Sequence, residues 1–106
     1  MARRSDPQAI FCSRLKEARL AAGLSQKQLG IRAEIDPFVA STRINRYEKG
    51  IHRADLSTVT RLAEALNVPL AYLYAEDERL ARMILAFSKL PRAKQESLLK
   101  SLEKKV

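Results

Sequence analysis

The sequence predicts an all-α fold, in which a five-helix bundle is followed by a C-terminal two-helix hairpin. Three observations support this prediction. Leu, Ala, Lys, Arg and Glu, which favour helices, dominate the 106 residues, and only three residues are glycine. Apolar residues recur at intervals of three and four, as on one face of a helix. Val, Ile and Thr alternate with polar residues over no long stretch, so strands are not expected.

The first helix is expected to begin at Pro7, because Asp6 can cap its first turn and proline suits the first helical position. Gly23 suits the left-handed position that ends a helix. Between these ends, apolar residues fall on one face at helical spacing: Phe11, Leu15, Ala18 and Ala22.

The second helix has a start signal in its side chains. The Ser25 hydroxyl can accept a hydrogen bond from the Gln28 backbone N–H, while the Gln28 side chain can bond back to the Ser25 backbone, which makes a capping box. The helix is therefore expected from Gln26 to about residue 33 or 34. Gly30 within it lowers helical propensity but permits the close approach of a neighbouring helix.

Two starts remain open for the third helix. Asp36 and Pro37 form a good pair of N-cap and first helical residue, so the helix can begin at Pro37. Alternatively, residues 37–40 form an extended turn and the helix begins near Ser41, which is also a good cap. In both cases Ile44 and Tyr47 lie on the inner face of the helix.

Two further helices are expected to complete the bundle. Asp55 caps the fourth helix, and Pro69 prevents its continuation beyond the exit at Asn67. A short fifth helix follows over residues 70–74. The core face of the fourth helix is formed by Leu56, Val59, Leu62 or Ala63, and Leu66.

Two amphipathic helices are expected beyond Ala75. The first starts in the acidic run of residues 76–78, and the second begins at Pro91. The short joint before Pro91 indicates a helical hairpin. The two apolar stripes consist of Leu80, Met83, Ile84 and Phe87, and of Leu98, Leu99, Leu102 and Val106.

The charge of the chain indicates a polyanionic partner. The formal net charge is +8 and the pI is about 10.1, which favours nucleic acid first and an anionic membrane surface second. No apolar run approaches the ~20 residues of a membrane span, and residues 1–11 lack the hydrophobic core of an export signal. One cysteine cannot form an internal disulfide, which fits a cytoplasmic location.

Enzyme activity is not expected. The chain has one histidine and one cysteine, far apart in sequence, and it lacks the HExxH, GxSxG and P-loop patterns. No cluster of residues has the spacing of metal ligands. We therefore expect no cofactor and no metal, and we interpret His52 as a neighbour of a phosphate or as a surface residue.

The third helix carries five polar side chains within six residues. Such side chains form hydrogen bonds to the edges of bases in DNA, and the competing interpretation is a solvated helix face. The five are Ser41, Thr42, Arg43, Asn45 and Arg46. Together with the short helix and turn before them and the positive net charge, they predict a DNA-binding helix-turn-helix.

These features together resemble the phage Cro/repressor-type (Xre-like) helix-turn-helix transcriptional regulators. The resemblance covers roughly residues 10–75 and implies a bundle that binds double-stranded DNA, usually as a homodimer, with its third helix in the major groove. The matching features, in order, are Arg19, then Leu24-Ser25-Gln26 with Leu29, then Ile44-Asn45-Arg46-Tyr47-Glu48-Lys49-Gly50, and finally Leu62-Ala63-Glu64-Ala65-Leu66-Asn67-Val68.

The resemblance also implies roles for individual residues. Ser41, Thr42 and Arg46 take the main base-facing positions, with Arg43 and Asn45 beside them. Arg19 and Glu48 match a pair that forms a structural salt bridge. Contacts to the DNA backbone are expected from residues that flank the third helix: Gln26, which alternatively holds an outer base, and Lys27, Arg32, Lys49, His52 and Arg53.

The chain departs from the family pattern between the second and third helices. The segment around residues 36–40 is about four residues longer than usual, so the base-facing register can shift. Phe38 and Val39 within it either contact methyl groups of DNA or only pack. A second departure is the C-terminal hairpin, which lies outside the shared unit.

We divide the chain into a basic tail (1–8), a DNA-binding domain (9–75) and a C-terminal hairpin (76–106). Arg3 and Arg4 in the tail are either solvated or form an arm on DNA. The hairpin is interpreted as a dimer interface formed by Leu80, Met83, Ile84, Phe87, Leu98, Leu99 and Leu102; the competing interpretation is that it covers the domain's own core. A DNA-binding antitoxin whose C-terminal part binds a protein partner is the alternative function.

Overall fold

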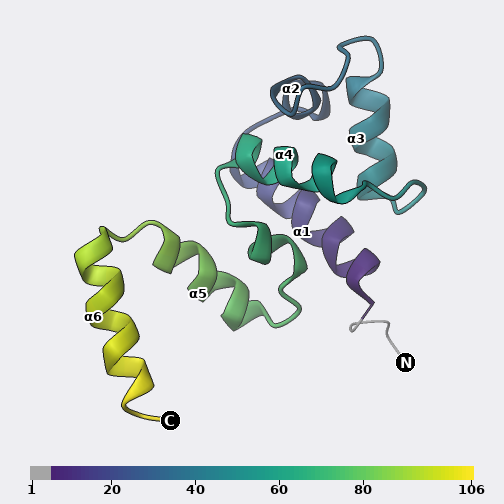
Figure 1. Cartoon of the computed structure of the whole chain (residues 1–106). Coiled ribbons are helices and arrows are strands. Elements are labelled where there is room, and N and C mark those ends of the chain that lie inside the picture. The colour runs from purple at the N-terminus through teal and green to yellow at the C-terminus, as the bar shows by residue number, and fades with distance from the viewer. Residues whose placement is uncertain (1–5) are drawn as a thin grey trace.

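In the computed structural model, which describes residues 6–106, every regular element is helical, as the sequence predicts (Figure 1). Five elements form a bundle, and two helices follow it. The bounds are α1 (Pro7–Ala21), α2 (Gln26–Arg32), α3 (Ala40–Glu48), α4 (Leu56–Leu66), the 3-10 helix η1 (Leu70–Tyr74), α5 (Glu78–Ser88) and α6 (Arg92–Glu103). Residues 6–8, which we assigned to the tail, form the N-cap and first turn of α1, and Arg3 and Arg4 lie outside the described residues.

Side-chain caps begin four of these helices where the sequence predicts them. Asp6 accepts a hydrogen bond from Gln8 N in α1 at 3.0 Å. Both bonds of the predicted capping box are present, from Gln28 N to Ser25 Oγ at 3.0 Å and from Ser25 N to Gln28 Oε1 at 2.8 Å. Asp55 and Asp77 cap α4 and α5 by accepting from Thr58 N and Leu80 N. Each cap satisfies a backbone donor that has no partner within its helix.

Four helices end on a residue in the left-handed conformation. One is Asn67, the predicted exit of α4, which has φ of 57°. Gly23 after α1 and Gly50 after α3 have φ of 71° and 73°, which costs glycine little. Glu34 after α2 has φ of 69°, although it carries a Cβ. Its conformation is fixed by two backbone bonds of a Schellman motif, from Glu34 N to Ile31 O at 3.0 Å and from Ile35 N to Gly30 O at 2.9 Å.

The third helix starts close to the later of the two predicted positions. Its first residue is Ala40, which follows Val39 rather than a residue with a capping side chain. Ala40 is fully buried against Gly30 of α2, where a Cβ on the glycine would meet the Ala40 Cβ at 2.6 Å. The prediction that Gly30 permits close approach of a neighbouring helix is therefore confirmed.

One hydrophobic core joins α1, α2, α3, α4 and η1. Most of the predicted apolar faces point into it, so the burial of their side chains offsets the entropy of ordering the chain. The prediction was wrong for Ala22 and Leu56, which lie at helix ends and are exposed, Leu56 to 68%. The largest side chains that are fully buried are Leu15, Leu29, Ile44, Leu62, Leu73 and Val59.

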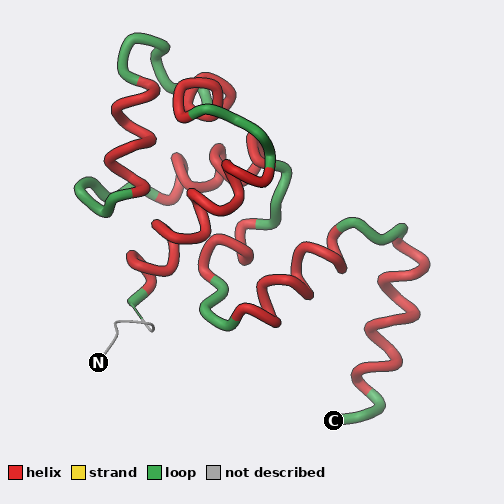
Figure 2. The backbone as a smooth tube through the Cα atoms, turned by 180° about the vertical axis from the view of Figure 1, so that it is seen from behind, coloured by secondary structure: helices red, strands yellow, loops and turns green. Residues whose placement is uncertain are grey.

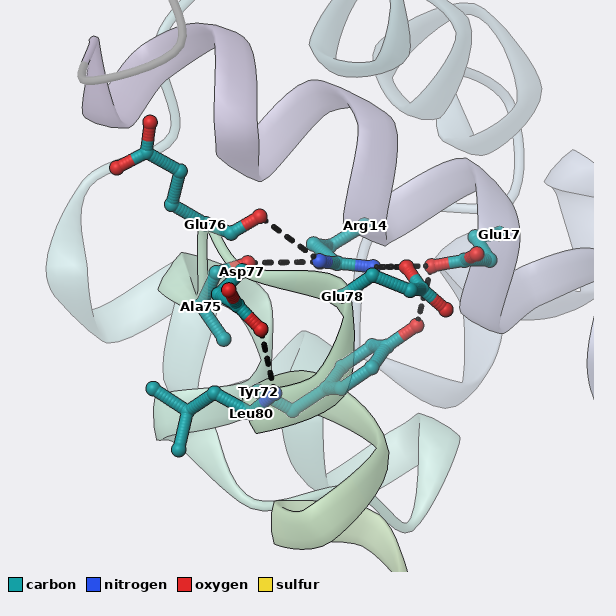
Figure 3. Close-up of polar contacts among 8 residues, drawn as sticks. All are labelled: Arg14, Glu17, Tyr72, Ala75, Glu76, Asp77, Glu78 and Leu80. Carbon is teal, nitrogen blue, oxygen red and sulfur yellow. Dashed lines mark hydrogen bonds and ion pairs between the residues drawn. The ribbon is translucent and has the colours of Figure 1, made fainter.

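Helix α5 is attached to the bundle by a buried arginine (Figure 3). The Arg14 guanidinium donates to Ala75 O at 2.8 Å, to Glu76 O at 3.2 Å, and to Glu17 Oε1 and Glu78 Oε1 at 2.9 and 2.8 Å. These bonds connect α1 to the segment that leads into α5. Apolar contacts on the same side are made by Ala81, which is buried, and by Ile84 and Leu85, which are half-buried.

Tyr72 completes this cluster beneath the guanidinium. Its hydroxyl donates to Glu17 Oε1 at 2.7 Å, and its ring lies 5.6 Å from Arg14 Cζ. The hydrogen bonds from Tyr72 and Arg14 hold the pKa of Glu17 below its ordinary value. Burial and the neighbouring Glu17 carboxylate raise the pKa of Tyr72 to about 12. At neutral pH the cluster therefore contains an ionised glutamate and a protonated tyrosine.

Helix α6 extends away from the bundle after the short joint at residues 89–91 (Figures 1 and 2). It meets α5 near this joint, where Gln95 Nε2 donates to Phe87 O at 2.8 Å. The two helices then diverge, so they form an open hairpin. No side chain of α6 is buried against the described chain.

Candidate nucleic-acid interface

The outer face of α3 carries most of the predicted base-contacting side chains. Ala40, Ile44 and Tyr47 are buried and define the inner face of the helix. At about 100° per residue, the opposite face consists of Thr42, Asn45 and Arg46, with Ser41 at its edge. All of these except Asn45, which is half-buried, are exposed. Their donors and acceptors therefore point away from the bundle, in the direction from which a partner can approach.

Arg43 differs from the other predicted base-contacting residues. Its Nε and Nη2 donate to Tyr47 Oη at 3.2 and 3.0 Å, and its Cζ lies 5.8 Å from the centre of the Tyr47 ring. The guanidinium is thus held along the flank of α3 rather than on its outer face. Its five donors are not all used by these two bonds, so the group is positioned but retains hydrogen-bonding capacity.

A buried ion pair fixes α3 against α1. Arg19 Nε and Nη2 donate to Glu48 Oε2 and Oε1 at 2.6 and 3.2 Å, and Arg19 Nη1 donates to Leu24 O at 3.0 Å. The side chains of Arg19 and Glu48 are only 11% and 4% exposed. Two parallel bonds of this kind set the orientation as well as the distance of the two helices. The structure thus gives Glu48 a structural position, at the C-terminal end of α3.

Gln26 at the start of α2 joins the same cluster. Its Nε2 donates to Glu48 Oε1 at 3.1 Å, so the amide group is oriented by the carboxylate of α3. The side chain remains half-exposed. Because the amide nitrogen is bonded to Glu48, the amide oxygen of Gln26 remains available to accept a hydrogen bond from a partner.

Exposed cationic or ionisable side chains flank α3 on both sides. The structure places them on α2 and on the segment after α3: Lys27 and Arg32, and then Lys49, His52 and Arg53. Because α2 packs directly on α3, the groups on α2 lie beside the helix, and the other three follow its C-terminal end. Such an arrangement suits contacts to phosphates on either side of a groove.

Sequence reasoning missed two arginines that organise the bundle. Arg14 is buried in the cluster described above. Arg61 of α4 donates to Ala33 O at 3.1 Å and so bonds the C-terminal end of α2. The sequence did contain a signal for the burial of Arg14. This residue lies on the apolar face of α1, three residues after Phe11 and four before Ala18.

The residues predicted to form a dimer interface fall into two groups. Ile84 packs partly against the bundle core, and Phe87 of α5 and Leu98 of α6 are half-buried. The others are exposed, with accessible fractions of 53% for Leu80, 44% for Met83, 43% for Leu99 and 41% for Leu102. The structure therefore leaves an apolar surface on both C-terminal helices.

Two further observations concern other classes of site. Among residues 6–106, no group of three or more His, Cys, Asp or Glu side chains could hold a metal ion. Within the same residues, no helix combines the length and the apolar character that a transmembrane helix requires.

Comparisons with known proteins agree with this geometry. The helix-turn-helix family matches residues 15–73. The solved structure described as the crystal structure of transcriptional regulator BswR is 43% identical to this chain, with a TM-score of 0.82, and the match covers 88% of this chain and 92% of that chain. No curated protein gives a match. The predicted resemblance to Xre-like proteins is confirmed: the chain belongs to the helix-turn-helix family of DNA-binding transcriptional regulators.

Proposed function

We propose that this protein is a cytoplasmic, sequence-specific transcriptional repressor that binds an inverted repeat in double-stranded DNA as a homodimer. The observation that carries the proposal is the exposed, polar outer face of α3. The helix itself is held in place by the buried ion pair of Arg19 and Glu48. A rigid helix of this kind fits the major groove, whose width admits one α-helix. In the simplest case, repression follows from occupation of a promoter.

Base contacts come from the outer face of α3 in this proposal. Arg46 can bind guanine O6 and N7 through two donors, and Asn45 can bind adenine. Ser41 and Thr42 contact bases near the start of the helix. Arg43, held on the flank by Tyr47, contributes beside them. The cations of α2 and of the segment after α3 position the protein by binding phosphates.

Replacing Arg46 by alanine is expected to lower affinity for the cognate site by ~1–3 kcal/mol without a change in melting temperature, because Arg46 is exposed. Binding is measured by fluorescence anisotropy on cognate and scrambled duplexes. Arg79→Ala is the matched control, since Arg79 is an exposed arginine on α5. An equal loss of affinity on both duplexes would show that Arg46 contacts phosphate rather than bases.

The dimer in this proposal forms through the apolar surface of α5 and α6. A helix of about twelve residues is marginal in water unless an apolar face packs against something, and no side chain of α6 is fully buried against the described chain. A second copy would cover Leu99 and Leu102, and would bring two copies of α3 to successive turns of the duplex, ~34 Å apart.

Replacing both Leu99 and Leu102 by aspartate is expected to convert the dimer to a monomer, measured by light scattering. The bundle should keep its melting transition because neither residue contributes to its core. Leu20→Asp is the control, since Leu20 is equally apolar and 59% exposed on α1. A dimer that persists would place the interface elsewhere. A wild-type protein that is already monomeric would favour the alternative function, in which the C-terminal helices bind a different protein.

The function is tested by selecting sites from a pool of random duplexes with the purified protein. Recovery of an inverted repeat supports a dimeric, sequence-specific regulator and supplies the cognate site used in the other experiments. Binding that is sensitive to salt but enriches no sequence would reduce the role of the protein to non-specific binding through its positive charge.

A further inference from the structure

The segment between α2 and α3 is longer than a helix-turn-helix requires and is held by packing and hydrogen bonds. Residues 33–39 connect the two helices, whereas three or four residues are usual. Both ends of the segment are anchored, because Ile35 is 6% exposed and Ala40 is fully buried. The Schellman motif described above also fixes Glu34. The additional residues therefore form a projecting loop before the start of α3. Figure 1 shows this loop between the end of α2 and the beginning of α3.

A tight turn at the tip of this segment holds Phe38 in solvent. The Asp36 side chain accepts a hydrogen bond from Phe38 N at 2.9 Å, and the Asp36 carbonyl accepts from Val39 N at 3.0 Å. Pro37 between them has a fixed φ. The phenyl side chain on this turn is 98% exposed, so it does not pack on the bundle.

An exposed apolar side chain is ordinary in itself, but the location of Phe38 limits the kind of chemical group that it can contact in a partner. It lies two residues before α3, at the end of the helix whose first residues contact bases in the proposed function. The segment contains the carboxylates of Glu34 and Asp36 and no cationic residue, so its side chains do not favour contacts with phosphates. An apolar contact within the major groove remains, and the apolar group exposed there is the 5-methyl group of thymine.

We propose that Phe38 is a specificity-determining residue that packs on the 5-methyl group of a thymine next to the bases contacted by the first turn of α3. This inference rests on the proposed function. The inference adds to the proposed function a direct base contact from a residue outside α3, and with it a preference for thymine at one position of each half-site.

The first test compares the sites that wild type and Phe38→Ala select from random duplexes. We expect thymine at one flanking position of each half-site with the wild type. The variant should lose this preference and keep the rest of the site, because α3 is unchanged. Phe38→Leu, which keeps an apolar group, should retain part of the preference. Leu20→Ala is the control, since it removes an exposed apolar side chain from α1 and should select the wild-type site.

The second test removes the methyl group from the DNA. Each thymine of the selected site is replaced in turn by deoxyuridine, and affinities are measured for wild type and Phe38→Ala. At the flanking position we expect about a 3- to 10-fold loss for the wild type, the order of magnitude for losing the contact of one buried methyl group, and no loss for the variant. An equal loss for both proteins would overturn the proposal, and so would selected sites that do not differ.

These outcomes separate the inference from the proposed function. If the wild type selects no sequence, the proposed function fails, and the contact from Phe38 fails with it. If the wild type selects an inverted repeat that Phe38→Ala also selects with equal affinity, only the role of Phe38 is overturned. A melting temperature lowered by several degrees in Phe38→Ala would also overturn it, because it would show that the ring packs on the protein.

Discussion

Replacing Glu48 by alanine is expected to lower the free energy of unfolding by about 3–5 kcal/mol, because the substitution leaves the guanidinium of Arg19 buried without its carboxylate. Both side chains are almost inaccessible to water, so solvent cannot replace the two lost bonds. Gln26 loses an acceptor as well. For a domain of this size, such a change corresponds to a fall of more than ~10 °C in melting temperature, measured by circular dichroism.

Two variants test the physical reason for this effect. Arg79→Ala removes an ion pair in which the arginine side chain is 88% exposed, and its melting temperature should stay close to the wild-type value. The double variant Arg19→Met with Glu48→Leu should be more stable than Glu48→Ala, because it leaves no unpaired charge. A melting temperature of Glu48→Ala within a few degrees of wild type would show that the pair is not important for stability.

Replacing Arg14 by alanine is expected to lower the free energy of unfolding by about 2–3 kcal/mol, because hydrogen bonds from a charged donor to four acceptors are lost. The two carbonyl oxygens of Ala75 and Glu76 lose a buried donor, whereas the carboxylates of Glu17 and Glu78 are more than half exposed and can be hydrated. The effect should be strongest in α5, where amide hydrogen exchange is expected to accelerate more than in α2.

The matched variants for this prediction are Glu78→Gln and Arg14→Lys. Glu78→Gln should have a small effect because Arg14 keeps its other three acceptors. Arg14→Lys keeps the charge but not the planar group that reaches several acceptors, so it should be intermediate. Equal exchange rates in α5 for Arg14→Ala and the wild type would contradict an attachment of α5 through this residue.

Local signals in the sequence were sufficient to place most helices. Asp6, Ser25 and Asp55 cap helices within a few residues, so these starts depend on neighbours in the chain. The same holds for the ends at Gly23 and Gly50, where the left-handed conformation favours glycine. The polar face of α3 was also predictable, because it follows from the periodicity of a helix whose inner residues are apolar.

Features that depend on contacts between distant residues were not predictable in this way. The start of α3 is set by the packing of Ala40 on Gly30 rather than by the capping ability of Ser41. The buried position of Arg14 depends on carbonyl groups more than sixty residues away in the chain. The direction of Arg43 depends on the rotamer that lets it reach Tyr47, which periodicity alone does not determine.

The contact between Gly30 and Ala40 has a consequence for binding. Since Ala40 lies directly against the backbone of Gly30, with no room for a further atom, this contact fixes the position of α3 on α2 in the folded protein. The conformational entropy of placing α3 is therefore lost when the protein folds rather than when it meets its partner. Association then requires little ordering of the protein, and more of the free energy of the contacts remains available as affinity.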